Sequence, residues 1–338
     1  MLKFAFAGFR HAHIIGLYEK IKHHPDCTVV AAAEEDPAAA RQAREQWRIE
    51  LTHDNYRRMF DTVDFDVLAV GDYYARRGSL LLAALSAGKH VIADKPLCTD
   101  LIELQRVIEL SRQKNLRVGG MLDLRTHGNV LAARELIRSG RLGTVHAIRF
   151  DGQHPLNYET RPGWYFEPGK HGGTINDIAI HGLDLAEWIT GQSLERIVAA
   201  RTWNAFADRH PHFHDAAQFM AVMNNGCGVM GDVSYFFPDS HGYKLPFYWR
   251  VTLWGRRGVI EFNYNDPGVK AAFDGDSIPV VLPPQPVARD YFDDFLAEIA
   301  GVPAELTTEH ILSISRKALS LQKFADENRE YQSKEYLL

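Results

Sequence analysis

The first 120 residues alternate short apolar runs with longer helical patterns, and this alternation restricts the possible folds more than any other feature. The apolar runs are continuous and bounded by turn residues, as in strands buried on both faces of a parallel sheet. They lie at residues 2–8, 28–33, 66–71, 90–93 and 116–119. Helical patterns lie between them at 14–23, 37–47, 55–60, 79–87 and 101–113. The alternation predicts an α/β domain with a doubly wound, Rossmann-type parallel sheet.

The pattern changes after residue 120, and the 338 residues are enough for a second domain. A helix at 129–138, a strand at 144–151, an irregular stretch at 152–173 and a helix at 174–190 come first. β-rich runs at 196–206, 216–223, 228–236, 249–253 and 258–262 follow, and helices at 290–300 and 309–327 end the chain. Turn signals at 224–226 and 257–258 predict hairpins. We therefore expect a dinucleotide-binding domain over 1–121 and an α+β domain with an open, mostly antiparallel sheet over 122–338.

Charge and composition exclude several classes of partner. The net charge of −5 gives no electrostatic attraction for nucleic acid or an anionic membrane. No apolar run approaches the roughly 20 residues of a membrane span, and the apolar stretch at the N-terminus is too short for a signal peptide. Three widely spaced cysteines, Cys27, Cys98 and Cys227, fit a reducing compartment. We expect a cytoplasmic protein that binds neither nucleic acid nor membrane.

The first predicted strand runs into a turn where dinucleotide-binding proteins carry G-x-G-x-x-G. Here the turn reads Gly8-Phe9-Arg10-His11-Ala12-His13. Only the first glycine is present, because Arg10 and His13 occupy the second and third positions. Taken alone, the turn is equally compatible with a plain strand–turn–helix connection.

The end of the second predicted strand strengthens the nucleotide interpretation. Glu34 lies close to the spacing from Gly8 at which an acidic residue binds the adenosine ribose. A carboxylate there accepts hydrogen bonds from the ribose hydroxyls and repels a 2′-phosphate, so NAD is favoured over NADP. The alternative is that Glu34, Glu35 and Asp36 form a solvated, acidic start of a helix.

Two sequence blocks carry a family resemblance that spans nearly the whole chain. Residues 88–97 read GKHVIADKPL, and residues 172–184 read GGTINDIAIHGLD. In order and separation they resemble A-G-K-H-V-x-x-E-K-P-L and G-G-x-x-x-D-x-x-x-H-x-x-D of the glucose–fructose oxidoreductase / inositol dehydrogenase / MocA family. The resemblance implies a Rossmann domain, then an open-faced sheet domain, with the active site between them. It implies hydride transfer between NAD(P) and a hydroxyl or carbonyl carbon of a sugar, cyclitol or related polyol, and a homo-oligomer, either dimer or tetramer.

The resemblance also implies catalytic residues. Lys95 matches the lysine of the first block, and Asp177 and His181 match the aspartate and histidine of the second. Hydride transfer needs a base for the hydroxyl proton and a group that polarises the oxygen, and we assign these roles to His181 and Lys95. Asp177 and His181 are four residues apart and share one helix face. The alternatives are a surface lysine before a loop proline and a buried histidine satisfied by backbone.

By position, the cofactor contacts fall on the turn after the first strand and on the ends of later strands. The predicted residues are Gly8, Phe9, Arg10, His11, Glu34, Asp72, Tyr73, Asp94, Lys95 and Pro96. Pro96 matches a proline whose preceding peptide bond is often cis in the family. Asp94 replaces the usual glutamate, and residues 71–77 replace the A-T-P-N-x-x-H that lies along the nicotinamide. These departures motivate a second hypothesis, a non-catalytic sensor or regulatory protein of the same fold.

Two further sets of residues are candidates for contacts to substrate or metal. Arg161, Trp164 and Tyr165, in the irregular stretch, are candidates to contact a polyol, although a packed loop core is an equal alternative. Asp184 is a weaker substrate candidate that we expect mainly to support the helix. His210, His212 and His214 would share one face of a strand and form a metal cluster, as in a metal-dependent hydrolase. No separated fourth ligand is evident, so we expect a loop and no metal there.

Overall fold

A computed structural model describes residues 1–243 and 248–327. The chain divides into two compact units, each described by itself. The first unit contains Met1–Met121, Pro162–Gly172 and Tyr291–Ser315. The second contains Leu122–Arg161, Gly173–Asp290 and Arg316–Leu338. Two segments from later in the chain therefore pack with the N-terminal 121 residues.

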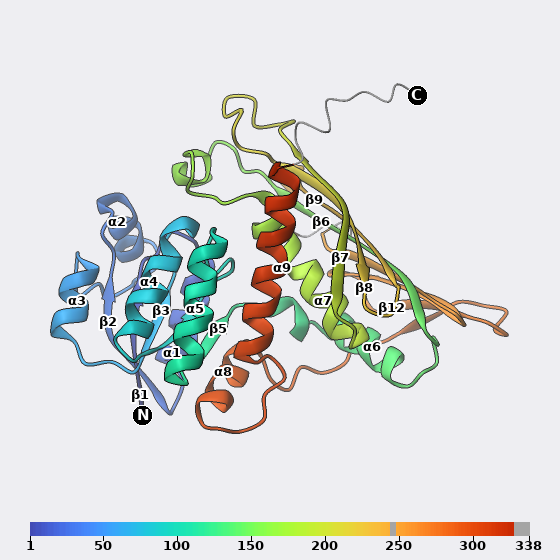
Figure 1. The fold of residues 1–338 in the computed structure, drawn as a ribbon, viewed down its shortest axis with the longest axis horizontal. Helices are drawn as coiled ribbons and strands as arrows, with labels where there is room; N and C mark the ends of the chain where they lie inside the picture. Colours follow the sequence, from blue (N-terminus) through green and yellow to red (C-terminus); the bar gives the residue numbers. More distant parts are fainter. Residues whose placement is uncertain (244–247, 328–338) are drawn as a thin grey trace. The chain divides into compact units, whose positions relative to one another are not determined.

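The first unit is built on a five-stranded parallel sheet in the order β2-β1-β3-β4-β5. Its strands are β1 (Leu2–Ala7), β2 (Cys27–Ala33), β3 (Val67–Val70), β4 (His90–Ala93) and β5 (Val118–Gly120). Its helices are α1 (His13–Lys22), α2 (Pro37–Glu45), α3 (Tyr56–Thr62), α4 (Tyr74–Ser86), α5 (Leu101–Lys114) and α8 (Tyr291–Ile299). In Figure 1, α1 to α5 lie beside these strands. The predicted doubly wound fold is confirmed, and its strand order changes direction between β1 and β3.

Local capping explains where several of these helices begin. The Asp36 side chain accepts a hydrogen bond from Ala39 N, and Pro37 occupies the first helical position of α2. Asn55 caps α3 and Asp100 caps α5 in the same way. Each cap satisfies N–H groups that have no partner within the helix.

Helix α4 begins at Tyr74, five residues before the predicted start at 79. Tyr73, the residue before the helix, provides no side-chain cap, and Gly78 lies buried within the helix. A Cβ at Gly78 would collide with the Glu103 carboxylate of α5. The glycine therefore permits close packing of α4 on α5 rather than ending the helix.

The second unit contains an eight-stranded sheet in the order β13-β12-β11-β10-β6-β9-β8-β7. Its strands are β6 (Val145–Pro155), β7 (Leu194–Trp203), β8 (Ala216–Met223), β9 (Gly228–Phe237), β10 (Arg250–Gly255), β11 (Gly258–Asn263), β12 (Val269–Phe273) and β13 (Val280–Leu282). All neighbours are antiparallel except β6 and β9. The predicted fold class and both predicted hairpins are confirmed. The short strands β12 and β13 were not predicted, and β13 is largely exposed.

Helices cover one face of this sheet. The long helices are α6 (Gly128–Arg138), α7 (Ile180–Thr190) and α9 (Thr308–Glu327), and α9 belongs to the second unit only from Arg316. A π-helix, Ile175–Ala179, precedes α7. The 3₁₀ helices are Asp123–Thr126, Asp239–His241 and, in the first unit, Gly163–Phe166. Helix α7 packs on β6, and α6 packs on β11 and β12. No helix in the described residues is both long and apolar enough to cross a membrane.

Candidate cofactor and catalytic sites

The turn between β1 and α1 keeps the geometry of an anion site although two glycines are missing. Gly8 has a φ of 87°, and a Cβ there would lie 2.6 Å from Asp72 N. Arg10 N and His11 N donate to Gly71 O at 3.0 and 3.3 Å. Among the described residues no acceptor receives the N–H groups of Ala12 and His13. Two N–H groups at the N-terminus of a ten-residue helix fit a dinucleotide pyrophosphate.

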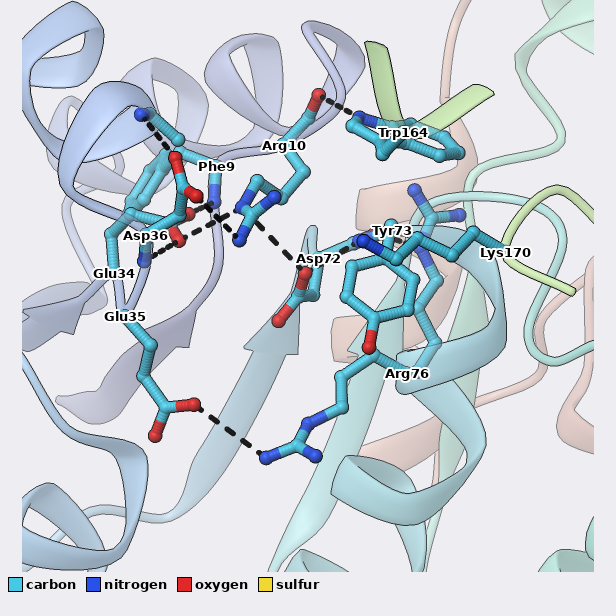
Figure 2. A network of polar contacts seen from close by, with 12 residues as sticks. Phe9, Arg10, Glu34, Glu35, Asp36, Asp72, Tyr73, Arg76, Trp164 and Lys170 are labelled. Carbon is cyan, nitrogen blue, oxygen red and sulfur yellow. Dashed lines mark hydrogen bonds and ion pairs between the residues drawn. The ribbon is translucent and has the colours of Figure 1, made fainter. Parts of the chain in front are cut away.

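Glu34 directly follows β2, and its side chain contacts the turn between β1 and α1 (Figure 2). Its side chain is 1% exposed. The carboxylate accepts hydrogen bonds from Phe9 N at 2.7 Å, Asp36 N at 2.9 Å and Arg10 Nε at 3.1 Å. Burial raises the pKa of Glu34, while the two N–H groups oppose that shift. The carboxylate is therefore an ordered, desolvated acceptor and not part of a solvated helix start.

Arg10 lies within a group of carboxylates (Figure 2). Besides Glu34, its guanidinium lies 3.3 Å from Asp36 and 4.0 Å from Asp72. Asp72 follows β3, and its carboxylate accepts from Tyr56 OH at 2.7 Å and Tyr73 N at 2.6 Å. One guanidinium thus faces three carboxyl groups, and burial raises the pKa of both Glu34 and Asp72.

Lys95 is the second residue after β4, at the sheet edge where open α/β sheets bind ligands. Its side chain is 4% exposed, and the Lys95–Pro96 peptide bond is cis, as the resemblance implied. Arg77 is fully buried and donates to Asp94 O at 2.8 Å and Pro96 O at 3.0 Å. A guanidinium therefore holds the backbone on both sides of Lys95. The sequence gives no signal for this role, because the bonds of Arg77 go to main-chain carbonyls of a distant segment.

The side chain of Asp94 points back to the β1–α1 turn. Its Oδ2 contacts His11 Nδ1 and accepts from Arg77 Nη2 at 3.1 Å. Burial opposes ionisation of Asp94, but His11 and Arg77 together hold its pKa well below the usual range. Burial lowers the pKa of His11 to about 4, against the opposing effect of Asp94. At neutral pH the pair is a carboxylate beside a neutral imidazole.

Two of the candidate substrate residues pack within the first unit. Trp164 is 4% exposed and donates from Nε1 to Arg10 O at 3.2 Å, and Tyr165 is 2% exposed with its hydroxyl 2.8 Å from that of Tyr74. These contacts support the packed-loop alternative. Arg161, in the second unit, donates to Leu156 O and Pro155 O. As substrate contacts all three stay predictions.

Asp177 and His181 lie in the second unit on the predicted helix, which forms in two parts. Asp177 lies in the π-helix and His181 in the first turn of α7, and both side chains are buried. Single π-turns occur frequently at functional sites, and the pattern of residues did not predict this one. Tyr235 on β9 donates its hydroxyl to Asp177 Oδ2, and the Trp249 ring lies 5.8 Å from the His181 ring. Sequence reasoning missed Tyr235, because a strand residue distant in the chain leaves no local signal.

Asp184 makes a buried ion pair in the second unit. Its two carboxylate oxygens lie 2.9 and 2.7 Å from Arg125 Nε, and Oδ1 lies 2.5 Å from Arg125 Nη2. Both residues are almost fully buried. This bidentate contact agrees with the expectation that Asp184 mainly supports the helix, and its role as a substrate contact stays a prediction.

The pair predicts a large effect on stability. Asp184→Asn leaves a buried guanidinium without its counter-charge, so we expect the free energy of unfolding to fall by about 3–5 kcal/mol. Denaturant unfolding followed by circular dichroism measures the change. Lys323→Ala, at an exposed ion pair with Glu327, is the control and should stay within about 0.5 kcal/mol. An equally small effect for Asp184→Asn would contradict the structural role.

The histidines at 210, 212 and 214 lie in the loop between β7 and β8, as expected. His214 Nδ1 lies 2.8 Å from Thr202 Oγ1, and the rings of His210 and His212 are 6.2 Å apart. Among the described residues, the group whose ligand atoms could share one metal ion is a different one, His11, His13 and Asp94.

A doubly wound sheet with an acidic residue after β2, followed by a large, mostly antiparallel sheet, defines a dinucleotide-binding protein of the oxidoreductase class. Residues 3–120 match the family model described as the oxidoreductase family with an NAD-binding Rossmann fold. Residues 130–261 match the GFO/IDH/MocA C-terminal domain. The chain therefore belongs to the Gfo/Idh/MocA oxidoreductase family.

Named relatives agree with this family. The chain is 25% identical over 206 residues to levoglucosan dehydrogenase of Pseudarthrobacter phenanthrenivorans, with 60% of this chain and 52% of the relative covered. It is 24% identical over 243 residues to myo-inositol 2-dehydrogenase of Thermotoga maritima, with 72% and 70% covered. The chain thus spans about half the length of the first relative. A solved oxidoreductase from Agrobacterium radiobacter, in complex with NAD⁺, L-tartaric acid and magnesium, has a TM-score of 0.78 at 18% identity, with 98% and 97% covered.

Proposed function

We propose that this protein is an NAD-dependent dehydrogenase or reductase that acts on a CH–OH or carbonyl carbon of a sugar, cyclitol or related polyol. The observation that carries the proposal is the buried Lys95 at the carboxyl end of β4, held by Arg77 through the carbonyls on either side. An ammonium fixed at the ligand-binding edge of a dinucleotide-binding sheet is suited to polarise a substrate oxygen. The relatives named for sugar and inositol substrates support the substrate class.

The residues of the first unit would hold NAD by contacts of distinct kinds. The free N–H groups of Ala12 and His13 would bind the pyrophosphate, and the ordered Glu34 carboxylate would accept from the ribose hydroxyls. The surplus of carboxylates around Arg10 favours NAD over NADP. NAD supplies the nicotinamide that accepts or donates the hydride.

The protein residues would manage the proton and the substrate oxygen. Lys95 donates to the oxygen and stabilises the charge that develops there, and His181 takes the hydroxyl proton in the direction of oxidation. Asp177, bonded by Tyr235, is a positioning residue for this set. Tyr235 donates to Asp177 and so restricts its side chain. Arg77 holds the backbone on either side of Lys95 and so restricts the position of that residue.

A substrate screen tests the proposal. The purified protein is incubated with NAD⁺ and sugars, inositols or sugar acids, and the absorbance of the reduced nicotinamide is followed. We expect at least one polyol to give turnover that depends on the enzyme. Tight binding of NAD without turnover on any member of the panel would favour the rival hypothesis of a non-catalytic sensor.

We also propose that the uncovered face of the large sheet pairs with a second copy of the chain. Met220 on β8 and Met230 on β9 are cross-strand partners and are 46% and 53% exposed. Trp254 on β10 is 43% exposed on the same face, and Arg149 on β6 lies between them. A hollow of about 490 Å³ runs along this face beside the two methionines. An exposed apolar patch rimmed by polar groups is typical of a protein–protein interface.

Charged substitutions on this face should dissociate the oligomer. For the wild type we expect light scattering to give a multiple of 38.3 kDa at micromolar concentration. The double variant Met220→Asp, Met230→Asp should shift to the monomer mass, because buried charges oppose pairing of the faces. Val302→Asp, at an exposed position of the first unit, is the control and should leave the mass unchanged. A wild type that is monomeric at all these concentrations would contradict the proposal.

A further inference from the structure

Two imidazoles and a carboxylate meet beside the β1–α1 turn, all within the first unit. His11 and His13 lie at this turn and at the start of α1, and Asp94 directly follows β4. One nitrogen or oxygen from each residue lies within 4.8 Å of the others. His11 Nδ1 contacts Asp94 Oδ2, and His13 Nδ1 lies 3.4 Å from Asp94 Oδ1. Ligand bonds near 2.0–2.2 Å in a tetrahedral site place neighbouring donor atoms about 3.3–3.6 Å apart. The 3.4 Å between His13 Nδ1 and Asp94 Oδ1 matches this separation.

The two oxygens of Asp94 differ in how they are satisfied. Oδ2 contacts His11 and accepts from Arg77, whereas Oδ1 is buried and has no hydrogen-bond partner among the described residues. The side chain of Asp94 is fully buried. A buried carboxylate oxygen without a partner costs at least about 1–3 kcal/mol, and such groups in native structures call for an ion or water. Oδ1 faces His13, so an ion there would satisfy both atoms.

The donor set defines the class of ion. Two imidazole nitrogens with one carboxylate oxygen suit Zn²⁺ or Co²⁺, whereas Mg²⁺ and Ca²⁺ prefer oxygen ligands. The ring of His13 is 52% exposed, so the site is open to solvent on that side. Arg77 is a fixed cation beside Asp94, and it opposes a second positive charge.

We propose that His11, His13 and Asp94 form a binding site for one divalent transition-metal ion of the zinc class. The ion would lie next to the free N–H groups of Ala12 and His13. Positive charge there would supply attraction for a pyrophosphate at the place where the family pattern has its third glycine. In this proposal the side chain of His13 binds the metal and its backbone N–H binds the pyrophosphate.

Direct metal binding to the untagged full chain tests this site. The protein is treated with a chelator, dialysed and titrated with Co²⁺ as a spectroscopic probe, and Zn²⁺ is then added as a competitor. We expect one Co²⁺ per chain, with visible absorption bands that disappear as Zn²⁺ displaces it. Absence of both saturable Co²⁺ binding and saturable Zn²⁺ binding to the wild type overturns the proposal.

Variants locate the site. His13→Ala changes a half-exposed side chain, so the fold should persist, and Co²⁺ affinity should fall by roughly tenfold or more. Zn²⁺ should raise the Tm of the wild type and raise that of His13→Ala far less. His23→Ala, an exposed histidine just beyond the C-terminus of α1, is the matched control and should bind like the wild type. Equal binding by His13→Ala and the wild type would place the metal elsewhere and refute the assignment.

Discussion

Removing Lys95 or His181 should lower kcat by roughly 10²–10⁴ while leaving NAD affinity little changed. In the proposed mechanism both groups act on the oxygen of the reacting carbon, where charge and proton position change in the transition state. Neither is needed for the proposed pyrophosphate and adenosine contacts, which lie on the β1–α1 turn and after β2. Steady-state kinetics of Lys95→Ala and His181→Ala, with NAD binding measured separately, give both quantities.

Matched controls separate chemistry from folding. Lys89→Ala changes the other lysine of the GKHVIADKPL block, whose side chain pairs with Asp64, and should keep near wild-type turnover. His212→Ala changes an exposed loop histidine and should do the same. Near wild-type kcat in both Lys95→Ala and His181→Ala would show that the catalytic assignment is wrong.

Substitution of Asp177 should have a smaller kinetic effect than substitution of Lys95 or His181. Asp177→Asn keeps the shape of the side chain and removes its charge. If Asp177 only orients its neighbours, kcat should fall less in this variant than in Lys95→Ala or His181→Ala. Tyr235→Phe removes the hydroxyl that bonds Asp177 and should produce a similar, smaller loss. The pH profile of kcat should lose one ionisation in His181→Ala and keep it in Tyr235→Phe, since imidazole is the proposed base.

Glu34→Gln should reduce kcat/KM for NAD by roughly 10–100-fold and narrow the preference for NAD over NADP. The substitution removes the charge that takes part in hydrogen bonds with Phe9 N and Arg10 Nε, and charge-assisted bonds contribute about 1.5–3 kcal/mol each. It also removes the negative charge that we propose repels a 2′-phosphate. Measuring kcat/KM for both cofactors checks the ratio.

Glu35→Gln is the control, because Glu35 is exposed and its carboxylate pairs with Arg76 at 3.5 Å. Glu35→Gln should change the ratio of kcat/KM for NAD to kcat/KM for NADP little. A wild type that prefers NADP(H) would contradict the role of Glu34.

The strands and most helices could be predicted because each leaves a local pattern. The strands of the first unit are continuous apolar runs between turn residues, and Asp36, Asn55 and Asp100 mark helix starts directly. The start of α4 was predicted too late, because the contact that explains Gly78 is made to Glu103 on another helix. The local sequence does not indicate such a tertiary contact.

The candidate site divides in the same way. Glu34 and Lys95 follow predicted strands, so their place at the sheet edge could be expected from the sequence. Arg77 and Tyr235 could not, because each is defined by a partner distant along the chain. The buried Oδ1 of Asp94 could not either, because only the fold shows that it has no hydrogen-bond partner among the described residues. A side chain that holds another by one hydrogen bond needs no fixed spacing, so no motif reveals it.

The transfer of a labelled hydride tests the central claim most directly. A polyol found in the screen is deuterated at the reacting carbon and oxidised with NAD⁺, and the reduced cofactor is analysed by mass spectrometry. The account predicts that the reduced nicotinamide gains one deuterium, and that Lys95→Ala forms it far more slowly. Reduced cofactor without deuterium, or equal rates for the wild type and Lys95→Ala, would contradict hydride transfer assisted by this residue.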